Sequence, residues 1–437
     1  MKRTLIEQIK EKSGQQIKIA GFVCAIRDQG SIKFLIVRDI SGTTQVVVAK
    51  DNTKPFKIVE SLSLESVVEI VGQVKVEKQA PGGVEILAEE ILILSTACPE
   101  LPIPVIQKGA EEADSQKRLD WRWLDLRKPE KKLIFQVWTL MEQAYREYWT
   151  KNNYIEIHSP KLMNSPSESG SELFEVKYFD RKAYLAQSPQ FYKQMAMASG
   201  FEKVFEVGPV FRANPSFTSR HDTEFTGYDA EISFIESHQD VMSELQNVVE
   251  HSIKAIKKKY GNEILKLYGR KLTVPKLPFP QVTMAEAKKI LSGLGVKSEK
   301  EGDLSPEEEA KLCKYIKKKE KHEFVFVTEW PINVRPFYHM RKENDPNITK
   351  SFDLLWSGLE VTTGAQREHR YDVLAAQAKE KDVGLDSIKH YLNFFKYGCP
   401  PHGGYGHGPT RCLMKIFNIS NVREVTYLYR GVKRLEP

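Results

Sequence analysis

Residues 211–231, FRANPSFTSRHDTEFTGYDAE, constrain what this chain can fold into more than any other segment does. An apolar run over residues 204–211 ends just before Arg212, a polar loop follows, and alternation resumes over residues 225–232. This pattern predicts two strands of a long β-hairpin. Arg212 suits a phosphate because a guanidinium donates two hydrogen bonds to anionic oxygens, and Phe225 can stack on a base. A surface hairpin would explain any one of these residues, but the whole set predicts a hairpin that binds a nucleotide.

The hairpin segment resembles motif 2 of the class II aminoacyl-tRNA synthetases, and it is most similar to the aspartyl enzymes. Class II enzymes have a motif 1 that ends in a proline at the dimer interface, and NNYIEIHSPKL places Pro160 after an alternating strand. Their motif 3 is a glycine-rich strand and turn followed by an arginine on a helix, and HGGYGHGPTRCLMKIF supplies Gly404 and Gly406 before Arg411. The three motifs come in the family's order, so the resemblance covers nearly the whole chain.

Residues 16–96 contain five short runs that alternate between apolar and polar residues. Five strands within about 80 residues predict a small barrel, and an oligonucleotide-binding barrel (OB-fold) fits this spacing. The candidates for contacts with bases are Arg27, Phe34 and Gln45. In the aspartyl family an arginine, a phenylalanine and a glutamine in this order hold the anticodon. Without the resemblance, Phe34 would more simply be a core aromatic.

The expected fold class is α+β, with three parts along the chain. Residues 1–100 are expected to form the five-stranded OB-fold anticodon-binding domain, and residues 101–130 a hinge or linker. Residues 131–437 are expected to form the class II catalytic domain, an antiparallel β-sheet flanked by helices. Residues 292–322 are highly charged and predict a solvated helical insertion. The lysines at 317–319 within it are more simply an exposed face than an RNA contact.

Composition narrows the class of protein less sharply. A chain of 437 residues with 41% hydrophobic residues can bury a large core in two or more domains. Five cysteines without a CxxC pair indicate neither a disulfide framework nor a zinc site. The net charge of +7 suits a polyanion such as tRNA without requiring one. No apolar run reaches membrane-spanning length and the N-terminus lacks a secretory signal, so we expect a cytoplasmic protein without membrane association.

The resemblance implies amino-acid activation, in which the carboxylate of L-aspartate attacks the α-phosphate of ATP and pyrophosphate leaves. Such a reaction needs no protein nucleophile, but it needs positive charge placed where negative charge builds up on the phosphates. The family's pattern assigns Arg212 to the α-phosphate and Arg411 to the γ-phosphate. It places His221 and Glu224 beside the ATP, and Phe225 on the adenine ring.

The segment LEVTTGAQREHRY supplies the residues expected to hold Mg²⁺. Magnesium prefers oxygen ligands and keeps several waters, so one carboxylate and one hydroxyl beside the ATP phosphates are enough. Glu360 and Thr363 match the family's metal-binding glutamate and hydroxyl residue, with threonine where serine is common. Asp353 of SFDLL is expected to support the metal. Together with Arg212 and Arg411, Glu360 completes the predicted catalytic set.

The choice of amino acid depends on the segment AQSPQFYKQMAM. Ser188 and Pro189 predict a helix start, so Gln190 and Lys193 share one electropositive face of its first turn. A lysine there pairs with a side-chain carboxylate, whereas an amide would leave the ammonium uncompensated at a cost of roughly 1–3 kcal/mol. The resemblance gives the aspartate side chain to two cations and the amino end to three further residues. These are Lys193 and Arg367 for the side chain, and Glu168, Gln190 and Asp229 for the amino end.

The chain departs from the family's pattern in two places. Before Arg411, Pro409 and Thr410 replace a leucine and an acidic residue, and His407 replaces an aliphatic residue. Near the C-terminus the usual Phe-Pro-Arg-Asp reads LYRG, over residues 428–431. These changes leave open a catalytically impaired RNA-binding or regulatory paralogue. The nearest enzyme alternative is an asparaginyl-tRNA synthetase.

The resemblance also names partners. The aspartyl group is expected to pass to tRNA(Asp). The Ala-Pro-Gly-Gly turn at residues 80–83 resembles that of members that charge both tRNA(Asp) and tRNA(Asn). A homodimer is expected because motif 1 builds the subunit interface in the family. The predicted ligands are therefore ATP, Mg²⁺, L-aspartate and tRNA.

Overall fold

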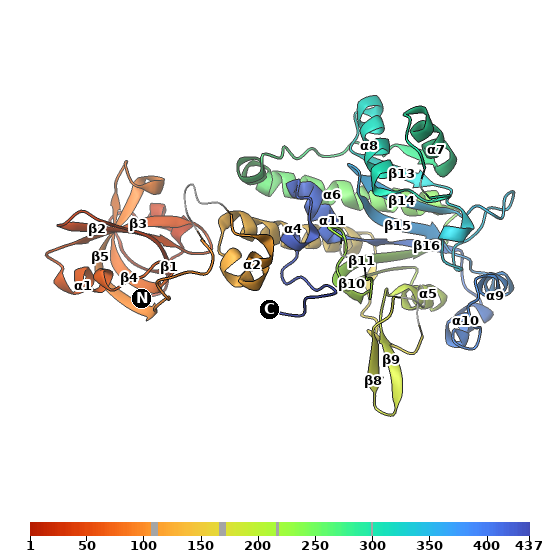
Figure 1. The fold of residues 1–437 in the computed structure, drawn as a ribbon, viewed down its shortest axis with the longest axis horizontal. Coiled ribbons are helices and arrows are strands. Elements are labelled where there is room, and N and C mark those ends of the chain that lie inside the picture. The colour runs from red at the N-terminus through yellow and green to blue at the C-terminus, as the bar shows by residue number, and fades with distance from the viewer. Residues whose placement is uncertain (106–111, 166–171, 216–217, 299) are drawn as a thin grey trace. The chain divides into compact units, whose positions relative to one another are not determined.

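The computed structural model describes residues 1–105, 112–165, 172–215, 218–298 and 300–437. The chain divides into two compact units, Met1–Trp121 and Arg122–Pro437 (Figure 1). Each unit has its own sheet and its own core, and each is described by itself.

The N-terminal unit is a closed five-stranded barrel with the strand order β1-β2-β3-β5-β4. Its strands lie where the sequence predicts them: β1 Gln16–Asp28, β2 Ile32–Arg38, β3 Thr43–Ala49, β4 Val67–Val76 and β5 Val84–Ser95. Only β3 and β5 pair in parallel, and helix α1 (Thr53–Glu60) lies between β3 and β4 in the chain. Inward positions alternate with outward ones and carry Val, Ile and Leu side chains, which form the core. The predicted OB-fold is confirmed.

The predicted hinge region is largely helical beyond residue 114. Helices α2 (Ser115–Asp120) and α3 (Arg122–Asp125) precede the long helix α4 (Pro129–Lys151). The Asp114 carboxylate caps α2 by accepting hydrogen bonds from the backbone N–H groups of its first turn. Pro129 stands in the first turn of α4, where a missing N–H costs little.

The larger unit is built on an eight-stranded sheet with the order β12-β13-β14-β15-β16-β11-β10-β6. The strands are β6 Ile155–Glu156, β10 Lys203–Phe211, β11 Glu224–Ser233, β12 Gln281–Thr283, β13 Phe324–Thr328, β14 Ser351–Trp356, β15 Glu360–Gln366 and β16 His402–His407. The six central strands are antiparallel, as predicted, and the short edge strands β12 and β6 pair in parallel. The predicted hairpin is formed by β10 and β11.

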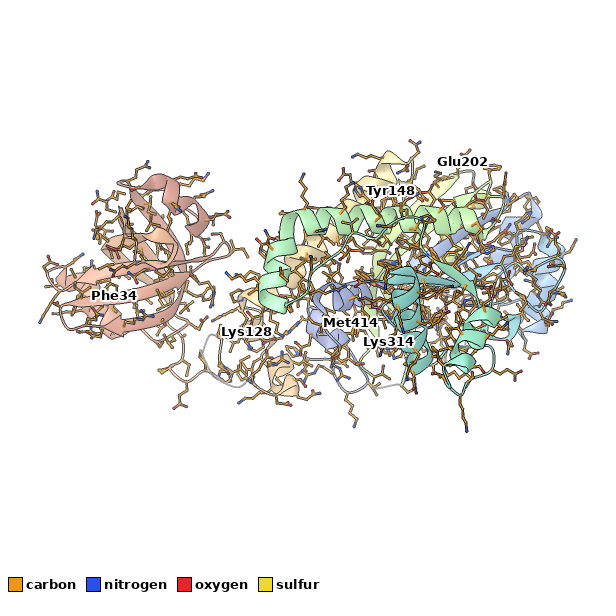
Figure 2. All side chains as sticks on the ribbon, turned by 90° about the horizontal axis from the view of Figure 1, so that it is seen from above. Phe34, Lys128, Tyr148, Glu202, Lys314 and Met414 are labelled. Carbon is orange, nitrogen blue, oxygen red and sulfur yellow. The ribbon has the colours of Figure 1, made fainter. Side chains whose placement is uncertain are left out.

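Helices and a small sheet surround the large sheet (Figures 1 and 2). Helix α6 (His238–Tyr268) packs on α4 and on β14, β15 and β16, while α5 (Gln190–Ala198) contacts β10 and β11. The remaining elements are the strands β7 Leu162–Met163, β8 Glu175–Tyr178 and β9 Arg181–Leu185 and the helices α7 Met284–Gly293, α8 Pro306–Glu320, α9 Tyr371–Glu380, α10 Lys389–Lys396, α11 Pro409–Phe417 and α12 Val422–Val425. The predicted charged insertion is helical at α8, whose inner face is buried in a core cluster. In the described part of the chain, no helix has the length and apolar character needed to cross a membrane.

The two faces of the central strands carry different kinds of side chain. One face is turned to α4, where Trp149 Nε1 donates to the Tyr405 hydroxyl at 3.2 Å and the Tyr145 hydroxyl meets His407 Nε2 at 2.9 Å. Neighbouring residues on a strand point to opposite faces. Asp229, next to the buried Tyr228, therefore belongs to the other face, as does Gly406. That other face carries the charged residues.

Candidate active site

A cavity of about 390 Å³ lies against this second face, beside β11, β15, β16 and α5. Ten residues predicted from the sequence line it: Gln190, Lys193, Arg212, His221, Phe225, Asp229, Glu360, Thr363, Arg367 and Arg411. Glu168 lies outside the described residues. Glu224 begins β11 and is exposed, and it is not among the lining residues. The structure thus brings residues from four separate sequence segments to one cavity.

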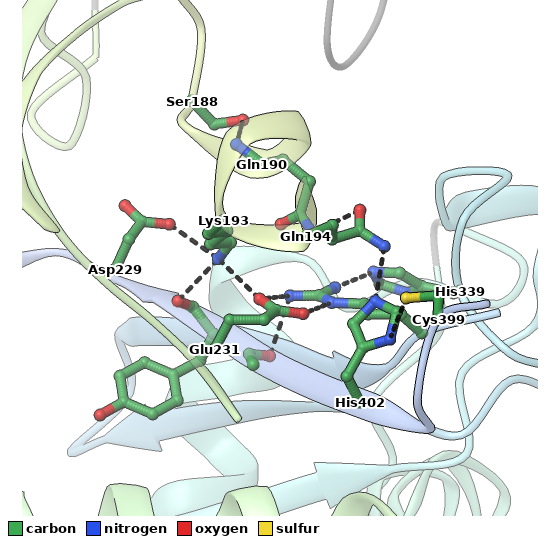
Figure 3. Close-up of polar contacts among 12 residues, drawn as sticks. Ser188, Gln190, Lys193, Gln194, Asp229, Glu231, His339, Cys399 and His402 are labelled. Carbon is green, nitrogen blue, oxygen red and sulfur yellow. Dashed lines mark hydrogen bonds and ion pairs between the residues drawn. The ribbon is translucent and has the colours of Figure 1, made fainter. Parts of the chain in front are cut away.

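Lys193 stands at one end of the cavity and is almost completely buried (Figure 3). Its Nζ lies 2.9 Å from Asp229 Oδ1 and 3.3 Å from Glu231 Oε2, and it donates to the Tyr405 carbonyl at 3.0 Å. The sequence predicted an electropositive face in the first turn of a helix that starts at Ser188 and Pro189. Instead, the helix begins at Gln190 and directs its lysine into the sheet, where two carboxylates compensate the ammonium.

Glu231 joins the two predicted cations of the aspartate site. Its Oε1 accepts from Arg367 Nε at 2.9 Å, while Oε2 faces Lys193 at 3.3 Å. The side chain is fully buried. Burial alone would raise the pKa of the Glu231 carboxyl, but Arg367 and Lys193 hold it below its ordinary value. Glu231 is therefore an anion that fixes the spacing of two cations.

Arg367 is also held from its other side. Its Nη2 donates to the Gly404 carbonyl at 2.9 Å and its Nη1 lies 3.0 Å from His339 Nε2. Because a guanidinium only donates, Nε2 is the acceptor and the imidazole is neutral. Burial, followed by the charge of Arg367, lowers the pKa of His339 well below its ordinary value. A neutral imidazole thus orients the arginine without adding a charge.

A chain of hydrogen bonds leads from Gln190, which lines this end of the cavity, through Gln194 to His402 (Figure 3). Gln190 Nε2 donates to Gln194 Oε1 at 2.9 Å, and the Tyr391 hydroxyl donates to the same oxygen at 3.0 Å. Gln194 Nε2 lies 3.0 Å from His402 Nε2. Burial lowers the pKa of His402 to about 4, so this imidazole is neutral at pH 7.

The glycines of β16 make room for this cluster. A Cβ built on Gly404 would lie 2.1 Å from Glu231 Oε2 and 2.1 Å from the Ala230 carbonyl. A Cβ on Gly406 would meet Asp229 Oδ1 at 3.4 Å, an ordinary contact. Gly404 is required by the packing of the strands, whereas Gly406 faces the cavity with space to spare.

Arginines gather at the other end of the cavity. The Arg212 guanidinium lies 5.8 Å from the centre of the Phe225 ring, across the base of the hairpin. Arg411 follows β16 on α11, and its Nη1 lies 3.2 Å from Glu360 Oε1. Burial would raise the pKa of Glu360, but Arg411, Arg335 and Arg212 hold it below its ordinary value. Glu360 is therefore ionised and surrounded by positive charge.

One carboxylate and one hydroxyl lie together beside these arginines. Thr363 Oγ1 donates to Glu360 Oε1 at 3.3 Å, and Asp353 is the direct partner of Thr363 in the β14–β15 pair. Asp353 is itself ion-paired with Arg335 at 2.7 Å. The described residues contain no group of three or more acidic, histidine or cysteine side chains that could hold a metal by themselves. Glu360 and Thr363 fit a cation that takes its other oxygens from a bound phosphate and water.

Two residues that line the cavity, Arg220 and His339, were missed from the sequence, and so was Glu231, which holds the lining residues Lys193 and Arg367. Glu231 follows Asp229 by two positions, and the period of two in a strand could have placed both on one face. Arg220 neighbours His221 in the same loop, and its Nη1 donates to Glu309 of α8 at 2.8 Å. His339 gave no local signal, because it reaches Arg367 from a segment without regular structure.

The three predicted anticodon residues share one face of the barrel. Arg27 pairs with Phe34 across β1 and β2, and Gln45 pairs with Ile36 across β2 and β3. Residues opposite each other, or two apart on one strand, lie on the same face. Arg27 is exposed, while Phe34, labelled in Figure 2, and Gln45 are half-buried on the outside of the barrel. Phe34 is therefore not a core aromatic.

Comparison with known proteins agrees with this architecture. Residues 114–430 match the family of class II tRNA synthetases for D, K and N, and residues 17–94 match the OB-fold nucleic acid binding domain. The chain therefore belongs to the class II aminoacyl-tRNA synthetases.

Individual relatives narrow the family further. The chain is 43% identical to an aspartate–tRNA(Asp/Asn) ligase from Methanopyrus kandleri, over 98% of this chain and 97% of that one. It is 41% identical to an aspartate–tRNA(Asp) ligase from Thermococcus kodakarensis, over 99% of this chain and 98% of that one. Within its class, the chain belongs to the aspartyl-tRNA synthetase family. The crystal structure of asparaginyl-tRNA synthetase from Pyrococcus horikoshii with asparaginyl-adenylate matches with a TM-score of 0.94 at 31% identity, covering 100% of both chains.

Proposed function

We propose that this chain, an aspartate–tRNA ligase by its family, activates L-aspartate with ATP and transfers the aspartyl group to tRNA at the cavity described above. The observation that carries the proposal is the distribution of charge along the cavity. One end holds two buried cations, Lys193 and Arg367, on the two oxygens of Glu231. The other end holds Arg212 and Arg411 beside Glu360. A ligand with a carboxylate at one end and phosphates at the other complements this arrangement.

The nucleotide is assigned to the hairpin end. Arg212 contacts the α-phosphate and Arg411 the γ-phosphate, each with a forked donor suited to phosphate oxygens. Phe225 stacks on the adenine ring, and His221 and Glu224 border the ATP. Support comes from the shared cavity of these residues, except for Glu224, whose role rests on the family's pattern alone.

The amino acid is assigned to the α5 end. Lys193 and Arg367 bind the aspartate side-chain carboxylate, and Glu168, Gln190 and Asp229 surround its amino group. Asp229, at 2.9 Å from Lys193, gives the amino group an anionic partner beside the cation that takes the carboxylate. Lys193 and Arg367 can only donate hydrogen bonds, so the NH2 group of an asparagine side chain would face them without an acceptor. This costs roughly 1–3 kcal/mol, and the site therefore favours aspartate over asparagine.

Magnesium is assigned to Glu360 and Thr363. When bound with ATP, Mg²⁺ supplies positive charge that offsets the charge on the phosphate oxygens. The protein's part is to hold one carboxylate and one hydroxyl at that place, with Asp353 fixed behind them by Arg335. Glu360, Arg212 and Arg411 thus form the proposed catalytic set.

The reaction proceeds in two steps. An oxygen of the aspartate α-carboxylate forms a bond to the α-phosphorus, and the bond between that phosphorus and the bridging oxygen of pyrophosphate breaks. A hydroxyl of the terminal ribose of tRNA then attacks the carbonyl carbon of the adenylate, and AMP leaves. Preorganised arginines stabilise the charge that develops on the phosphate during the first step.

The remaining assignments concern the partners. The barrel, residues 1–100, binds the anticodon through Arg27, Phe34 and Gln45, a hinge follows over residues 101–130, and residues 131–437 carry the chemistry. The enzyme is a cytoplasmic homodimer. Its tRNA choice is relaxed, so that it charges tRNA(Asp) and also tRNA(Asn). The presence of Arg212, Glu360 and Arg411 in one cavity argues against an impaired paralogue.

Charging of two purified tRNAs tests the proposal. The enzyme is incubated with labelled aspartate, ATP and Mg²⁺, together with either tRNA(Asp) or tRNA(Asn). Aspartylation of both is expected. Aspartylation of tRNA(Asp) alone would refute relaxed choice, and the absence of aspartylation of either would refute the ligase assignment.

A further inference from the structure

The C-terminal segment, residues 422–431, lies against the loop of the nucleotide hairpin, residues 218–223. The described residues of the two segments share four hydrogen bonds. These run from Val422 N to Ser219 O (2.9 Å), from Thr223 N to Arg430 O (3.1 Å), from Thr426 Oγ1 to Asp222 Oδ2 (3.3 Å) and from the Tyr429 hydroxyl to His221 O (3.3 Å). His221 and Asp222 both line the cavity. The C-terminal segment therefore holds the loop that carries His221 and Asp222 at the nucleotide end of the cavity.

Within this C-terminal segment, the Tyr429 ring fills the space that a side chain at position 431 would need. A Cβ built on Gly431 would lie 2.4 Å from the Tyr429 hydroxyl oxygen and 2.7 Å from the ring atoms Cε1 and Cζ. Cβ atoms do not approach other atoms so closely. The tyrosine is 5% exposed, and the Arg423 guanidinium lies 5.0 Å from its ring centre. The ring is thus confined on several sides and cannot move aside at low cost.

We propose that Tyr429 is a positioning residue for the nucleotide site and that Gly431 lacks a side chain because the Tyr429 ring takes its place. The Tyr429 hydroxyl donates a hydrogen bond to the His221 carbonyl. This bond fixes the backbone from which the side chains of His221 and Asp222 reach the cavity. This inference rests on the proposed placement of ATP at the hairpin end. It also accounts for the glycine of LYRG, because a tyrosine at 429 leaves no room for a side chain at 431.

The effect is expected on the nucleotide and not on the amino acid. His221 lies beside Arg411, the residue assigned to the γ-phosphate, and the charge of Arg411 contributes to lowering the pKa of His221 after the larger effect of burial. None of the four bracing hydrogen bonds involves Lys193 or Arg367, at the other end of the cavity. Weakening these four hydrogen bonds is therefore expected to raise the KM for ATP and to leave the KM for aspartate unchanged.

The first test is Tyr429→Phe in aspartate-dependent exchange of labelled pyrophosphate into ATP. Loss of one neutral hydrogen bond is expected to raise the KM for ATP by about 2- to 10-fold, with no change in the KM for aspartate. Tyr427→Phe is the matched control, because Tyr427 lies two positions earlier and is 60% exposed. An unchanged KM for ATP, or an equal rise in both constants, would overturn the positioning role.

The second test is the coupling between the two positions, and it needs no activity. Gly431→Ala is expected to lower the thermal midpoint clearly in the natural chain. The same change is expected to have little effect in a Tyr429→Ala background, because the ring that the new Cβ would strike is gone. Equal shifts in both backgrounds would refute the steric pairing. This readout separates failure of the inference from failure of the proposed function, which would show as absent exchange in the natural enzyme.

Discussion

At the scale of single residues, the amino-acid end of the site depends on how buried charges compensate one another. Lys193 and Arg367 are buried with Asp229 and Glu231, so the four formal charges cancel. Buried charges of this kind are stable only as a set, because removing one leaves its partner without compensation in a medium of low polarity. In the proposed function, an incoming aspartate therefore has to exchange partners within this set of paired side chains.

Replacement of Lys193 separates its two roles. Lys193→Met leaves Asp229 without its cation and Glu231 with Arg367 alone, so it should abolish aspartate activation and lower the free energy of unfolding by about 3–5 kcal/mol. Adding Glu231→Gln restores the charge balance and should recover much of the stability but none of the activity. Denaturant unfolding and pyrophosphate exchange measure the two effects.

The matched control is Lys182→Met. Lys182 is exposed and ion-paired with Glu175, so the expected change in stability is below about 1 kcal/mol. Retention of aspartate activation by Lys193→Met would contradict the assigned role of the lysine.

The raised pKa of Asp222 predicts that the free energy of unfolding depends on pH. Burial raises its pKa to about 7, from an ordinary value of 3.8. The folded state then binds the proton more tightly than the unfolded state, so the free energy of unfolding falls as pH rises from about 4 to about 7. Asp222→Asn stays neutral, so its stability relative to the natural chain should increase over that window by up to about 3 kcal/mol.

Denaturant unfolding at pH 5 and pH 8 checks this expectation. The exposed Asp372→Asn serves as the control. A difference between Asp222→Asn and the natural chain that stays constant with pH would show that the Asp222 carboxyl is not protonated in the folded state.

At the scale of elements, β16 is the strand on which the site depends. Its glycines let β11 and β15 approach while the buried Glu231 side chain passes over Gly404. Gly404→Ala places a Cβ 2.1 Å from two oxygens and should destabilise the fold by several kcal/mol, because backbone or Glu231 must shift. Gly406→Ala has room and should leave the thermal midpoint nearly unchanged. Equal stability of the two variants would contradict this account of the strand.

The same elements show what the sequence could and could not predict. The hairpin of β10 and β11, the barrel strands and the helix that begins at Pro409 follow from local patterns of period two, glycine and proline. The short helices after residue 114 were not predicted, because their signal is a single capping aspartate among prolines and charges. The strand predicted before Pro160 is present as the two-residue β6, whereas β12, with only three residues, was missed.

The candidate site divides in a similar way. Residues inside recognisable motifs, such as Arg212 and Arg411, could be predicted because each motif specifies which of its residues lies in the site. His339 could not, because its contact with Arg367 joins residues 28 positions apart through irregular backbone. The burial of Lys193 was also beyond the sequence, since a helix start gives no sign of the strand face that it meets.

At the scale of the whole molecule, the proposed chemistry and the proposed anticodon contacts belong to different units of the chain. A fragment of residues 114–437 contains the part that matches the synthetase family, residues 114–430, and every described residue of the cavity. It should keep aspartate-dependent pyrophosphate exchange while its aspartylation of tRNA falls by at least about tenfold, because about 1.4 kcal/mol of lost anticodon binding suffices for that. Intrinsic tryptophan fluorescence and the exchange assay show whether the fragment folds. Undiminished tRNA charging by a folded fragment would contradict the role of the barrel.

The measurement that tests the account most directly is exchange of labelled pyrophosphate into ATP by the full chain. Aspartate and asparagine are supplied in parallel, with Arg212→Ala as the variant. We predict exchange with aspartate alone, and its loss in the variant because the α-phosphate then lacks its guanidinium. Exchange driven by asparagine would contradict the assignment of Lys193 and Arg367 to a carboxylate, and absence of exchange with either amino acid would contradict the central claim that this cavity activates aspartate.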